Sequence, residues 1–408
     1  MKTIEVDLSR HFSIQISTLK FFGMWFFISH PIKSVRFWLS ILTKMFLGIV
    51  IFIIPTGGQS LYVIRLLIQG NAEIQEVVSI INLVMTELLA SVRLLDLFLR
   101  RNILMQLVDQ LMSKEFQFPL KPQQIILEKA VLYTRKLFWL FLSLSASDIL
   151  VHVVVVPGLG KFNYLPLKMD LIWFDVNQGS YFTYMYIYQV SYKPMVLGTF
   201  MALQTLPWAA MCCAISQLDV LIYNLENIKD LVKLTMAEKK CDSNTAFKEV
   251  FKGCIVHHCS IVRFVKTIQN AFGGQLSSTL WLNGCIVGTT AVQIFSIESP
   301  LDNITDVAWI LAYLFIMIGN LFVDCYFGNS VTVKSLRVST VVFCSPWIEL
   351  SKPLKKDLVL FIAKTQRPIV ITAVKFVPVS LETFTKIFVR YIVFLRRSGY
   401  SVLNCISY

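Results

Sequence analysis

The stretch VAWILAYLFIMIGNLFVDCYF, residues 307–327, decides the class of fold. A helix of about 20 apolar residues spans the ~30 Å hydrocarbon core of a bilayer, and residues 276–297 form a second stretch of this kind. The whole chain is 55% hydrophobic and 15% charged, with a mean hydropathy of +0.64, whereas soluble domains are about 25% charged. We therefore predict an integral membrane protein.

Further apolar stretches predict an all-α, polytopic fold with seven transmembrane helices. The predicted spans cover residues 37–54, 77–99, 137–156, 183–207, 276–297, 307–327 and 377–395. The last span is unusual because it contains charged residues, and Glu382, Lys386 and Arg390 follow one another at intervals of four. Charged side chains within a bilayer are costly and usually face protein or water. Glu87, Arg93 and Asp96 in the second span invite the same interpretation.

The distribution of Lys and Arg predicts the orientation of the chain. Residues 1–36, 100–136, 220–270 and 328–376 contain 5, 7, 8 and 8 of these residues, which is 28 of the 38 in the chain. The other connections contain only Arg65, Lys161 and Lys168. We expect a cytosolic N-terminus and an extracellular C-terminus. The sequon at Asn303 then falls in an outer connection and is a possible glycosylation site.

Amphipathic patterns continue beyond the spans on the predicted cytosolic side, over residues 208–275 and 334–370. Such helices either pack with each other or form a surface through which subunits assemble. Cys254, His257, His258 and Cys259 lie in the first of these regions. They do not share one helix face, so we expect a packed helix there and no metal ion or other cofactor.

Several classes of membrane protein fit the sequence poorly. A G-protein-coupled receptor has the opposite orientation, and its Asp-Arg-Tyr and Asn-Pro-x-x-Tyr motifs are missing. A transporter would usually contain internal repeats, and none is found. No phosphate loop, catalytic carboxylate pair or Ser/His/Asp group suggests an enzyme. We therefore do not expect catalysis.

Three stretches in the second half of the chain resemble the insect odorant receptor family. They are CIVHHCSIVRFVKTIQNAFGGQLSSTLWLNGCIVGTTAVQIF (254–295), DCYFGNSVTVKS (324–335) and KTQRPIVITAVKFVPVSLETFTKIF (364–388). YIYQV at 186–190 also fits. The end of the last span, RYIVFLRR (390–397), comes earlier than in the family. A gustatory receptor is the alternative, but that family's Thr-Tyr and Gln-Phe ending is missing.

The resemblance implies a tuning subunit of an odorant-gated, non-selective cation channel. Such subunits form heterotetramers with a co-receptor in the plasma membrane of sensory neurons and do not bind nucleic acid. The resemblance also divides the chain by role: a cytosolic segment (1–36), a four-helix odorant-pocket bundle (37–207), a cytosolic anchor (208–275), spans five and six (276–327), an anchor helix and turn (328–375), and a pore-lining helix with an extracellular tail (376–408).

The resemblance places the odorant pocket in the outer half of the second, third, fourth and sixth spans. Helical faces in these halves nominate residues that would bind a small, hydrophobic volatile by apolar burial. They are Val78, Ile81, Asn82 and Met85; Ala146, Ile149, Leu150 and Val153; Tyr181, Tyr184 and Tyr188; and Trp309, Tyr313 and Met317.

The resemblance also implies that the last span lines a water-filled pore, which would explain its charges. Glu382, Lys386 and Arg390 would form one stripe, and Ile387, Tyr391 and Phe394 a second, apolar stripe that narrows the pore. Four copies of Lys386 and Arg390 would repel cations, so we expect the homomer to conduct cations poorly. Alternatively, the two basic side chains pair with neighbouring subunits.

Overall fold

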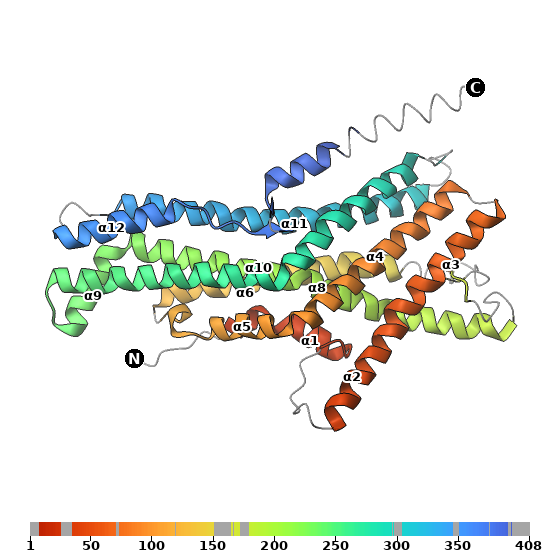
Figure 1. Cartoon of the computed structure of the whole chain (residues 1–408), viewed down its shortest axis with the longest axis horizontal. Coiled ribbons are helices and arrows are strands. Elements are labelled where there is room, and N and C mark those ends of the chain that lie inside the picture. The colour runs from red at the N-terminus through yellow and green to blue at the C-terminus, as the bar shows by residue number, and fades with distance from the viewer. Residues whose placement is uncertain are drawn as a thin grey trace.

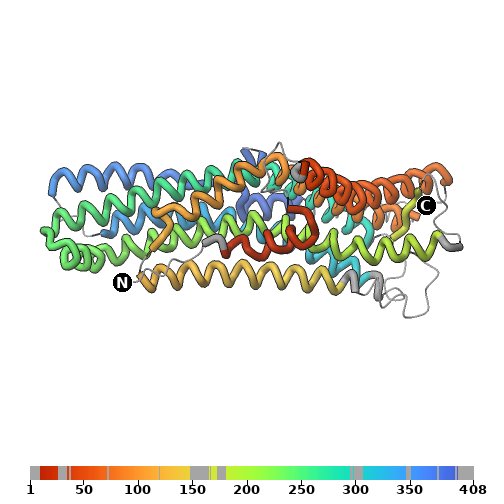
Figure 2. Tube along the Cα trace, turned by 90° about the horizontal axis from the view of Figure 1, so that it is seen from below, coloured from red at the N-terminus to blue at the C-terminus, as the bar shows by residue number. Residues whose placement is uncertain are grey.

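A computed structural model gives the fold of the chain. It describes residues 8–25, 35–70, 73–118, 120–150, 165, 167–171, 179–295, 297, 304–345, 351–374, 376–390 and 393. Within this part the chain is almost entirely helical, which confirms the prediction of an all-α fold. The helices form an elongated bundle (Figures 1 and 2). Asn303, Val153, Tyr391 and Phe394 lie outside the described residues.

Four of the described helices are long and apolar enough to cross a membrane. They cover Trp38–Gln69, Ile74–Leu99, Tyr181–Glu226 and Val307–Phe343, and they contain the predicted first, second, fourth and sixth spans. The first of them exposes apolar side chains along its length, including Trp38, Leu42 and Phe46, each more than half exposed. A helix with such a surface suits contact with lipid.

The first predicted span continues beyond its predicted end. Helix α2 (Val35–Gly48) passes through a single π-helical stretch, η2 (Ile49–Ile53), into α3 (Ile54–Gln69). The helix therefore continues beyond residue 54, where the predicted span ends. Pro55 lacks a backbone N–H, and the wider π-turn before it accommodates the proline without ending the helix. Gly70, with φ of 70°, ends α3 instead.

The longest helices run from the membrane into the predicted cytosolic region. They are α8 (Gly179–Glu226), α10 (Ser243–Phe295) and α11 (Ile304–Phe343). At 1.5 Å per residue, the 48 residues of α8 extend over ~70 Å, more than twice the hydrocarbon thickness. The helical patterns expected beyond the fourth span are thus confirmed up to Glu226. A short helix, α9 (Ile228–Lys239), joins α8 to α10 at one end of the bundle (Figure 1).

Shorter elements fill the sides of this bundle. The N-terminal part is a 3-10 turn, η1 (Leu8–His11), and a short helix, α1 (Ser13–Phe21). Helix α4 (Ile74–Leu99) is followed by α5 (Arg101–Leu111), the 3-10 turn η3 (Lys114–Phe116) and α6 (Lys121–Leu150). Helix α4 packs along α10, and α6 packs along α8. Segments far apart in sequence therefore form each wall of the bundle.

The C-terminal part returns from the far end of the bundle towards the membrane. Helix α12 (Lys352–Thr365) packs along α11. A short antiparallel hairpin follows, in which β1 (Thr372–Ala373) pairs with β2 (Val377–Pro378). A Cβ at Gly328 would lie 2.2 Å from the Val379 carbonyl oxygen. Gly328 therefore allows the chain after β2 to lie directly on α11 before the final helix begins at residue 381.

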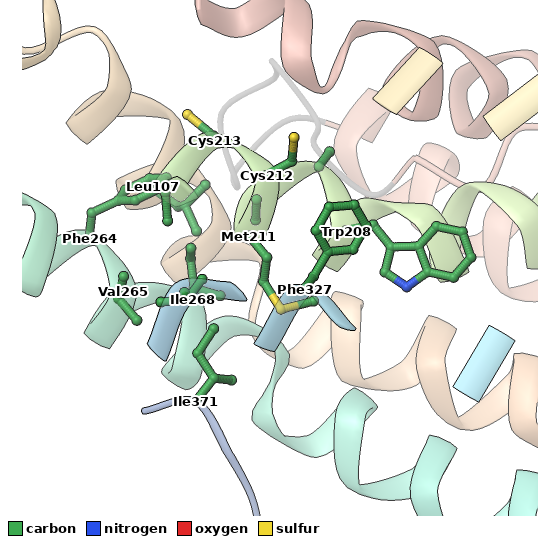
Figure 3. Close-up of a cluster of buried hydrophobic side chains, with 14 of the residues drawn as sticks. Leu107, Trp208, Met211, Cys212, Cys213, Phe264, Val265, Ile268, Phe327 and Ile371 are labelled. Atoms are coloured by element: carbon green, nitrogen blue, oxygen red, sulfur yellow. The ribbon is translucent and has the colours of Figure 1, made fainter. Parts of the chain in front are cut away.

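The apolar core lies where α8 crosses α5, α10 and α11. Between residues 200 and 214 every residue of α8 is buried. Trp208, Met211 and Cys213 are at most 1% exposed and meet side chains of the neighbouring helices (Figure 3). Contributors from those helices are Leu107, Phe264, Val265, Ile268 and Phe327, with Ile371 from the approach to β1. This packing fixes how the helices diverge around the cavity described below.

Candidate functional site

A cavity of about 180 Å³ lies between α4, α6, α8 and α11. These are the helices that contain the predicted second, third, fourth and sixth spans. Its walls are mainly apolar and aromatic. The lining residues are Leu83, Thr86, Glu87, Leu144, Ser145, Ser147, Leu167, Tyr192, Lys193, Val196, Leu197, Phe200, Met201, Trp309, Ala312, Tyr313, Ile316 and Met317.

Helix α11 presents its predicted face to the cavity. Trp309, Tyr313 and Met317 all line it. The Tyr313 hydroxyl is hydrogen-bonded to the Thr86 hydroxyl at 2.6 Å, which joins α11 to α4 across the wall. Met317 is 4% exposed and packs with Ile286 and Val287 of α10.

Helix α4 presents a neighbouring face instead of the predicted one. Leu83, Thr86 and Glu87 line the cavity, and Val78, Ile81, Asn82 and Met85 do not. Asn82 is 3% exposed, donates to the Gln293 side chain at 3.3 Å and accepts from the Thr289 hydroxyl. Asn82 therefore joins α4 to α10. Met85 packs near Met317, and Val78 and Ile81 are half-buried.

Helix α8 lines the cavity further along the chain than predicted. Tyr181 and Tyr184 are 54% and 71% exposed. Tyr188 packs beside Leu167 and Tyr192 and donates its hydroxyl to the Val50 carbonyl. The lining residues begin one turn later, with Tyr192 and Lys193, and end with Phe200 and Met201.

Helix α6 contributes Leu144, Ser145 and Ser147 to the cavity wall. Ala146, which was predicted, is exposed on another face. Ile149 and Leu150 belong to the helical backbone of α6, and their side chains are not described. Which face of α6 or α4 points into the cavity depends on how the helices pack against one another. The sequence of one helix alone does not determine this.

The cavity wall contains polar groups in an otherwise apolar surface. The Glu87 carboxylate accepts from the Thr56 hydroxyl at 3.0 Å and from the Gln59 amide at 3.2 Å, both on α3. The hydroxyls of Ser145 and Tyr192 are buried. That of Ser145 has no hydrogen-bond partner among the described residues, and that of Tyr192 interacts with Glu87 and Gln59 only at poor hydrogen-bond geometry. Charge and hydrogen-bonding capacity are thus concentrated at a few points.

A second cluster of polar side chains lies on the inner side of the cavity, and we call it the inner junction. It comprises Arg93, Phe200, Gln204, Trp208, Thr279 and Asp324. Arg93 is fully buried, donates to the Thr279 hydroxyl at 2.7 Å and lies over the Phe200 ring at 5.0 Å. The Trp208 indole N–H donates to Asp324 at 2.5 Å, and Asp324 also attracts Arg93 electrostatically. The inner junction therefore joins α4, α8, α10 and α11.

A sequence model described as "7tm Odorant receptor" matches residues 73–389, which is most of the chain. The chain belongs to the odorant receptor family. Odorant receptor 46a, isoform B, of Drosophila melanogaster is 21% identical over 79% of this chain and 82% of the relative. Odorant receptor Or2 of Anopheles gambiae is 27% identical over 38% of this chain, and the match spans only 39% of that relative.

The fold of this odorant receptor is that of the insect olfactory receptor OR5 from Machilis hrabei. The two structures superpose with a TM-score of 0.73 over 94% of this chain and 95% of the other, at 15% identity. The structure of OR5 in complex with eugenol gives a TM-score of 0.72 at 14% identity, with 96% and 97% coverage. This receptor is therefore a multi-pass membrane protein of the insect odorant receptor fold.

The final helix of the receptor exposes the predicted charged stripe. The Lys386 ammonium lies 2.6 Å from the Glu382 carboxylate, and these side chains are 68% and 74% exposed. Arg390 is also exposed. Ile387 is half-buried and packs on the core, and Phe384 of the same helix contacts the Phe322 ring of α11 at 5.5 Å. One face of this helix is thus held by α11, and the charged face is open.

His257, His258 and Cys254 of α10 are buried in the bundle, and Cys259 is exposed. His257 is hydrogen-bonded to Gln217 at 2.9 Å, and the His258 ring contacts Phe361 of α12. Burial lowers the pKa of His257 to about 3 and that of His258 to about 4. Nearby positive charge, from His258 on His257 and from Lys364 on His258, acts in the same direction. Both rings are therefore neutral packing groups at neutral pH.

Proposed function

We propose that this receptor is the odorant-binding subunit of a heterotetrameric, odorant-gated, non-selective cation channel. A co-receptor supplies the other subunits, and the assembly lies in the plasma membrane of a sensory neuron. The cavity between α4, α6, α8 and α11 carries the proposal. It lies within the bundle, where a volatile can leave water, and three of its four helices, α4, α8 and α11, are long and apolar enough to cross a membrane.

The cavity surface suits a small, mostly apolar ligand. Leu83, Leu197, Phe200, Ile316 and Met317 offer aliphatic, thioether and aromatic contacts, and burial of apolar area contributes roughly 25 cal/mol per Å². Polar groups at fixed positions would orient one end of such a ligand. The structure of OR5 from Machilis hrabei with eugenol shows that a receptor of this fold accommodates a small aromatic molecule.

The proposal that subunits assemble rests on apolar side chains of the cytosolic bundle. Val333 and Phe343 of α11 are 56% and 62% exposed, and Val359 and Leu360 of α12 are 62% and 61% exposed. These positions lie beyond the predicted spans, where lipid would not cover them. Apolar surface of this kind in water favours contact with another subunit.

The charged stripe of the final helix supports a shared pore. In a heterotetramer with one copy of this receptor, Lys386 and Arg390 would occur once around the pore. In a homotetramer they would occur four times, and the resulting positive ring would repel cations. We therefore expect cation current from the receptor expressed with its co-receptor and little from the receptor alone.

The decisive experiment records whole-cell current during application of a panel of volatiles, with the receptor expressed alone and with an insect co-receptor. Ligand-evoked cation current in the co-expressed case only is the expected result. Large currents from the receptor alone would contradict the pore argument. Ligand-dependent substrate flux without current would contradict the channel itself.

A further inference from the structure

One end of the cavity holds opposite charges close together. Glu87 of α4 and Lys193 of α8 both line it, and they attract one another electrostatically. Tyr192 lies beside Lys193 in sequence and also interacts electrostatically with Glu87. We call Glu87, Tyr192 and Lys193 the polar pole.

The side chains of the polar pole can form more hydrogen bonds than they make within the protein. An ionised carboxylate accepts about four hydrogen bonds, and Glu87 accepts two within the protein at good geometry, from Thr56 and Gln59 on the α3 side. The Tyr192 hydroxyl, although close to Glu87, is 2% exposed and has no well-oriented partner among the residues described. A ligand at the polar pole would therefore meet both an acceptor and a hydroxyl that can donate or accept.

The charge balance of the polar pole favours a neutral ligand. Glu87 and Lys193 carry opposite charges and attract each other, so the polar pole offers no single charge that would offset the cost of removing a charged ligand from water. Among neutral volatiles, only those with O–H or N–H groups can donate to Glu87. Ethers, esters and ketones only accept, and hydrocarbons do neither.

We propose that this receptor is selective for neutral volatiles with one hydroxyl group on a compact apolar skeleton, such as alcohols and phenols. The hydroxyl donates to Glu87 and accepts from Tyr192, and the skeleton packs against Leu197, Phe200 and Met317. This inference rests on the proposed function of the cavity as the odorant site. It adds the chemical class of the ligand and the residue that selects it.

The expected selectivity is large because a ligand without a donor leaves the remaining acceptor capacity of the buried Glu87 carboxylate unused, after its bonds to Thr56 and Gln59. Sites that hydrogen-bond a ligand hydroxyl discriminate strongly against analogues that lack it. Bonds to charged groups are the stronger kind, so we expect each alcohol to bind about tenfold or more tightly than its methyl ether.

The test uses probes matched in shape. The three series are hexanol, hexyl methyl ether and heptane; benzyl alcohol, benzyl methyl ether and ethylbenzene; and para-cresol, para-methylanisole and para-xylene. Binding is measured as ligand-induced thermal stabilisation of the purified receptor, and activation as current on co-expression with the co-receptor. The expected order in at least one series is alcohol or phenol, then ether, then hydrocarbon.

Glu87→Gln and a control variant test whether Glu87 causes the selectivity, and a third variant tests Tyr192. In Glu87→Gln one of the two carboxylate oxygens, which accept separately from Thr56 and Gln59, becomes an amide NH2 group. The site then loses an acceptor and gains a donor, so the ether should match or exceed the alcohol. Glu73→Gln is the matched control, the same change at an exposed position just before the same helix, and should keep the wild-type ratio. Tyr192→Phe removes only a hydroxyl and should weaken alcohol binding about threefold or more.

The outcomes separate this inference from the proposed function. Stabilisation by alcohols without any current would support the ligand class and contradict the channel. Currents or stabilisation by ethers and hydrocarbons equal to those by alcohols would overturn the ligand class and leave the channel proposal intact. An unchanged alcohol-to-ether ratio in a folded Glu87→Gln receptor, or no response to any hydroxylated probe, would also overturn it.

Discussion

The cavity and the inner junction lie next to each other along α8 and use polar side chains in opposite ways. In the cavity wall, the hydroxyls of Ser145 and Tyr192 make no well-oriented hydrogen bond within the described part of the chain. In the inner junction, Asp324 accepts from Trp208 and Gln204, and Arg93 lies between Thr279 and the Phe200 ring. Polar groups left open can select a ligand, and polar groups bonded between helices hold the helices in place.

One residue belongs to both regions. Phe200 lines the cavity, and its ring also carries the Arg93 guanidinium at 5.0 Å. Apart from this shared residue, a change in the inner junction should alter the whole fold, whereas a change in the cavity wall should alter ligand response alone.

Asp324→Ala should destabilise the receptor most. The change removes the acceptor of the Trp208 indole N–H and leaves Arg93 buried without its negative counterpart. Breaking a buried charge pair costs about 3–5 kcal/mol, so we expect a large loss of folded receptor and of thermal stability in detergent.

The control for this change is Asp230→Ala, at a side chain that is 72% exposed, which should change the free energy of unfolding by less than about 0.5 kcal/mol. Adding Arg93→Met to Asp324→Leu should recover part of the stability, because no uncompensated charge remains. Wild-type stability in Asp324→Ala would contradict the role of the inner junction.

Ala312→Phe should abolish or weaken ligand response without loss of fold. Ala312 lines the cavity, and the larger side chain would occupy part of its 180 Å³. We expect the ligand concentration for half-maximal current to rise about tenfold or more, which is about 1.4 kcal/mol of binding free energy.

Leu311→Phe tests the specificity of that effect. Leu311 is the preceding residue, is 49% exposed and does not line the cavity. Its substitution adds aromatic bulk to the same helix and should leave the response unchanged. Equal losses in the two variants would show that the effect comes from α11 and not from the cavity.

Acidification should destabilise the cytosolic bundle through its buried histidines. Burial lowers the pKa of His257 to about 3 from an unfolded value of 6.5, so the unfolded chain binds the proton first as pH falls. The free energy of unfolding should therefore decrease by about 1.4 kcal/mol per pH unit per histidine below pH ~6.5.

The measurement is thermal unfolding at about pH 7.5 and 5.5. His257→Gln keeps a neutral polar group near Gln217 and should reduce the difference between the two conditions. Lys266→Gln, at an exposed position on the same helix, should retain it. A pH response identical in His257→Gln and wild type would exclude His257 as a source.

Arg337→Ala should have the smallest effect. The ion pair between Arg337 and Glu226 is 3.0 Å long, and its side chains are 62% and 45% exposed. Surface pairs of this kind contribute less than about 1 kcal/mol and are screened by salt. Unfolding at low and high salt should show a difference between variant and wild type only at low salt.

Hydropathy predicted which segments of the chain become helices, and packing determined their ends. The span at 307–327 needed no other information, because its length and composition match the bilayer. The helix of the first span continues past Pro55, because a π-turn in a membrane helix accommodates a proline that would end most soluble helices. The strands of the hairpin at 372–378 have two residues each, which is too short to show the alternating pattern by which a strand is recognised in a sequence.

The four helices that contain the predicted pocket spans do surround a cavity. The face that each helix turns to the cavity was predicted correctly for α11 but not for α4. Helix α11 was predicted in phase, with Trp309, Tyr313 and Met317 on the wall. On α4 the prediction chose the face around Asn82, which instead binds α10 through Gln293. The available signal was Glu87 itself, because an acidic residue within a span has to face protein or water.

The inner junction also sets an order of events during synthesis. Arg93 and Asp324 are separated by 231 residues, since 324 − 93 = 231. At roughly 5–20 residues per second, Arg93 is made roughly 10–50 seconds before Asp324. During that time the second span contains a cation whose acidic partner has not yet been made. The four helices of the inner junction can therefore reach their final arrangement only after α11 has entered the membrane, so the receptor inserts first and packs afterwards.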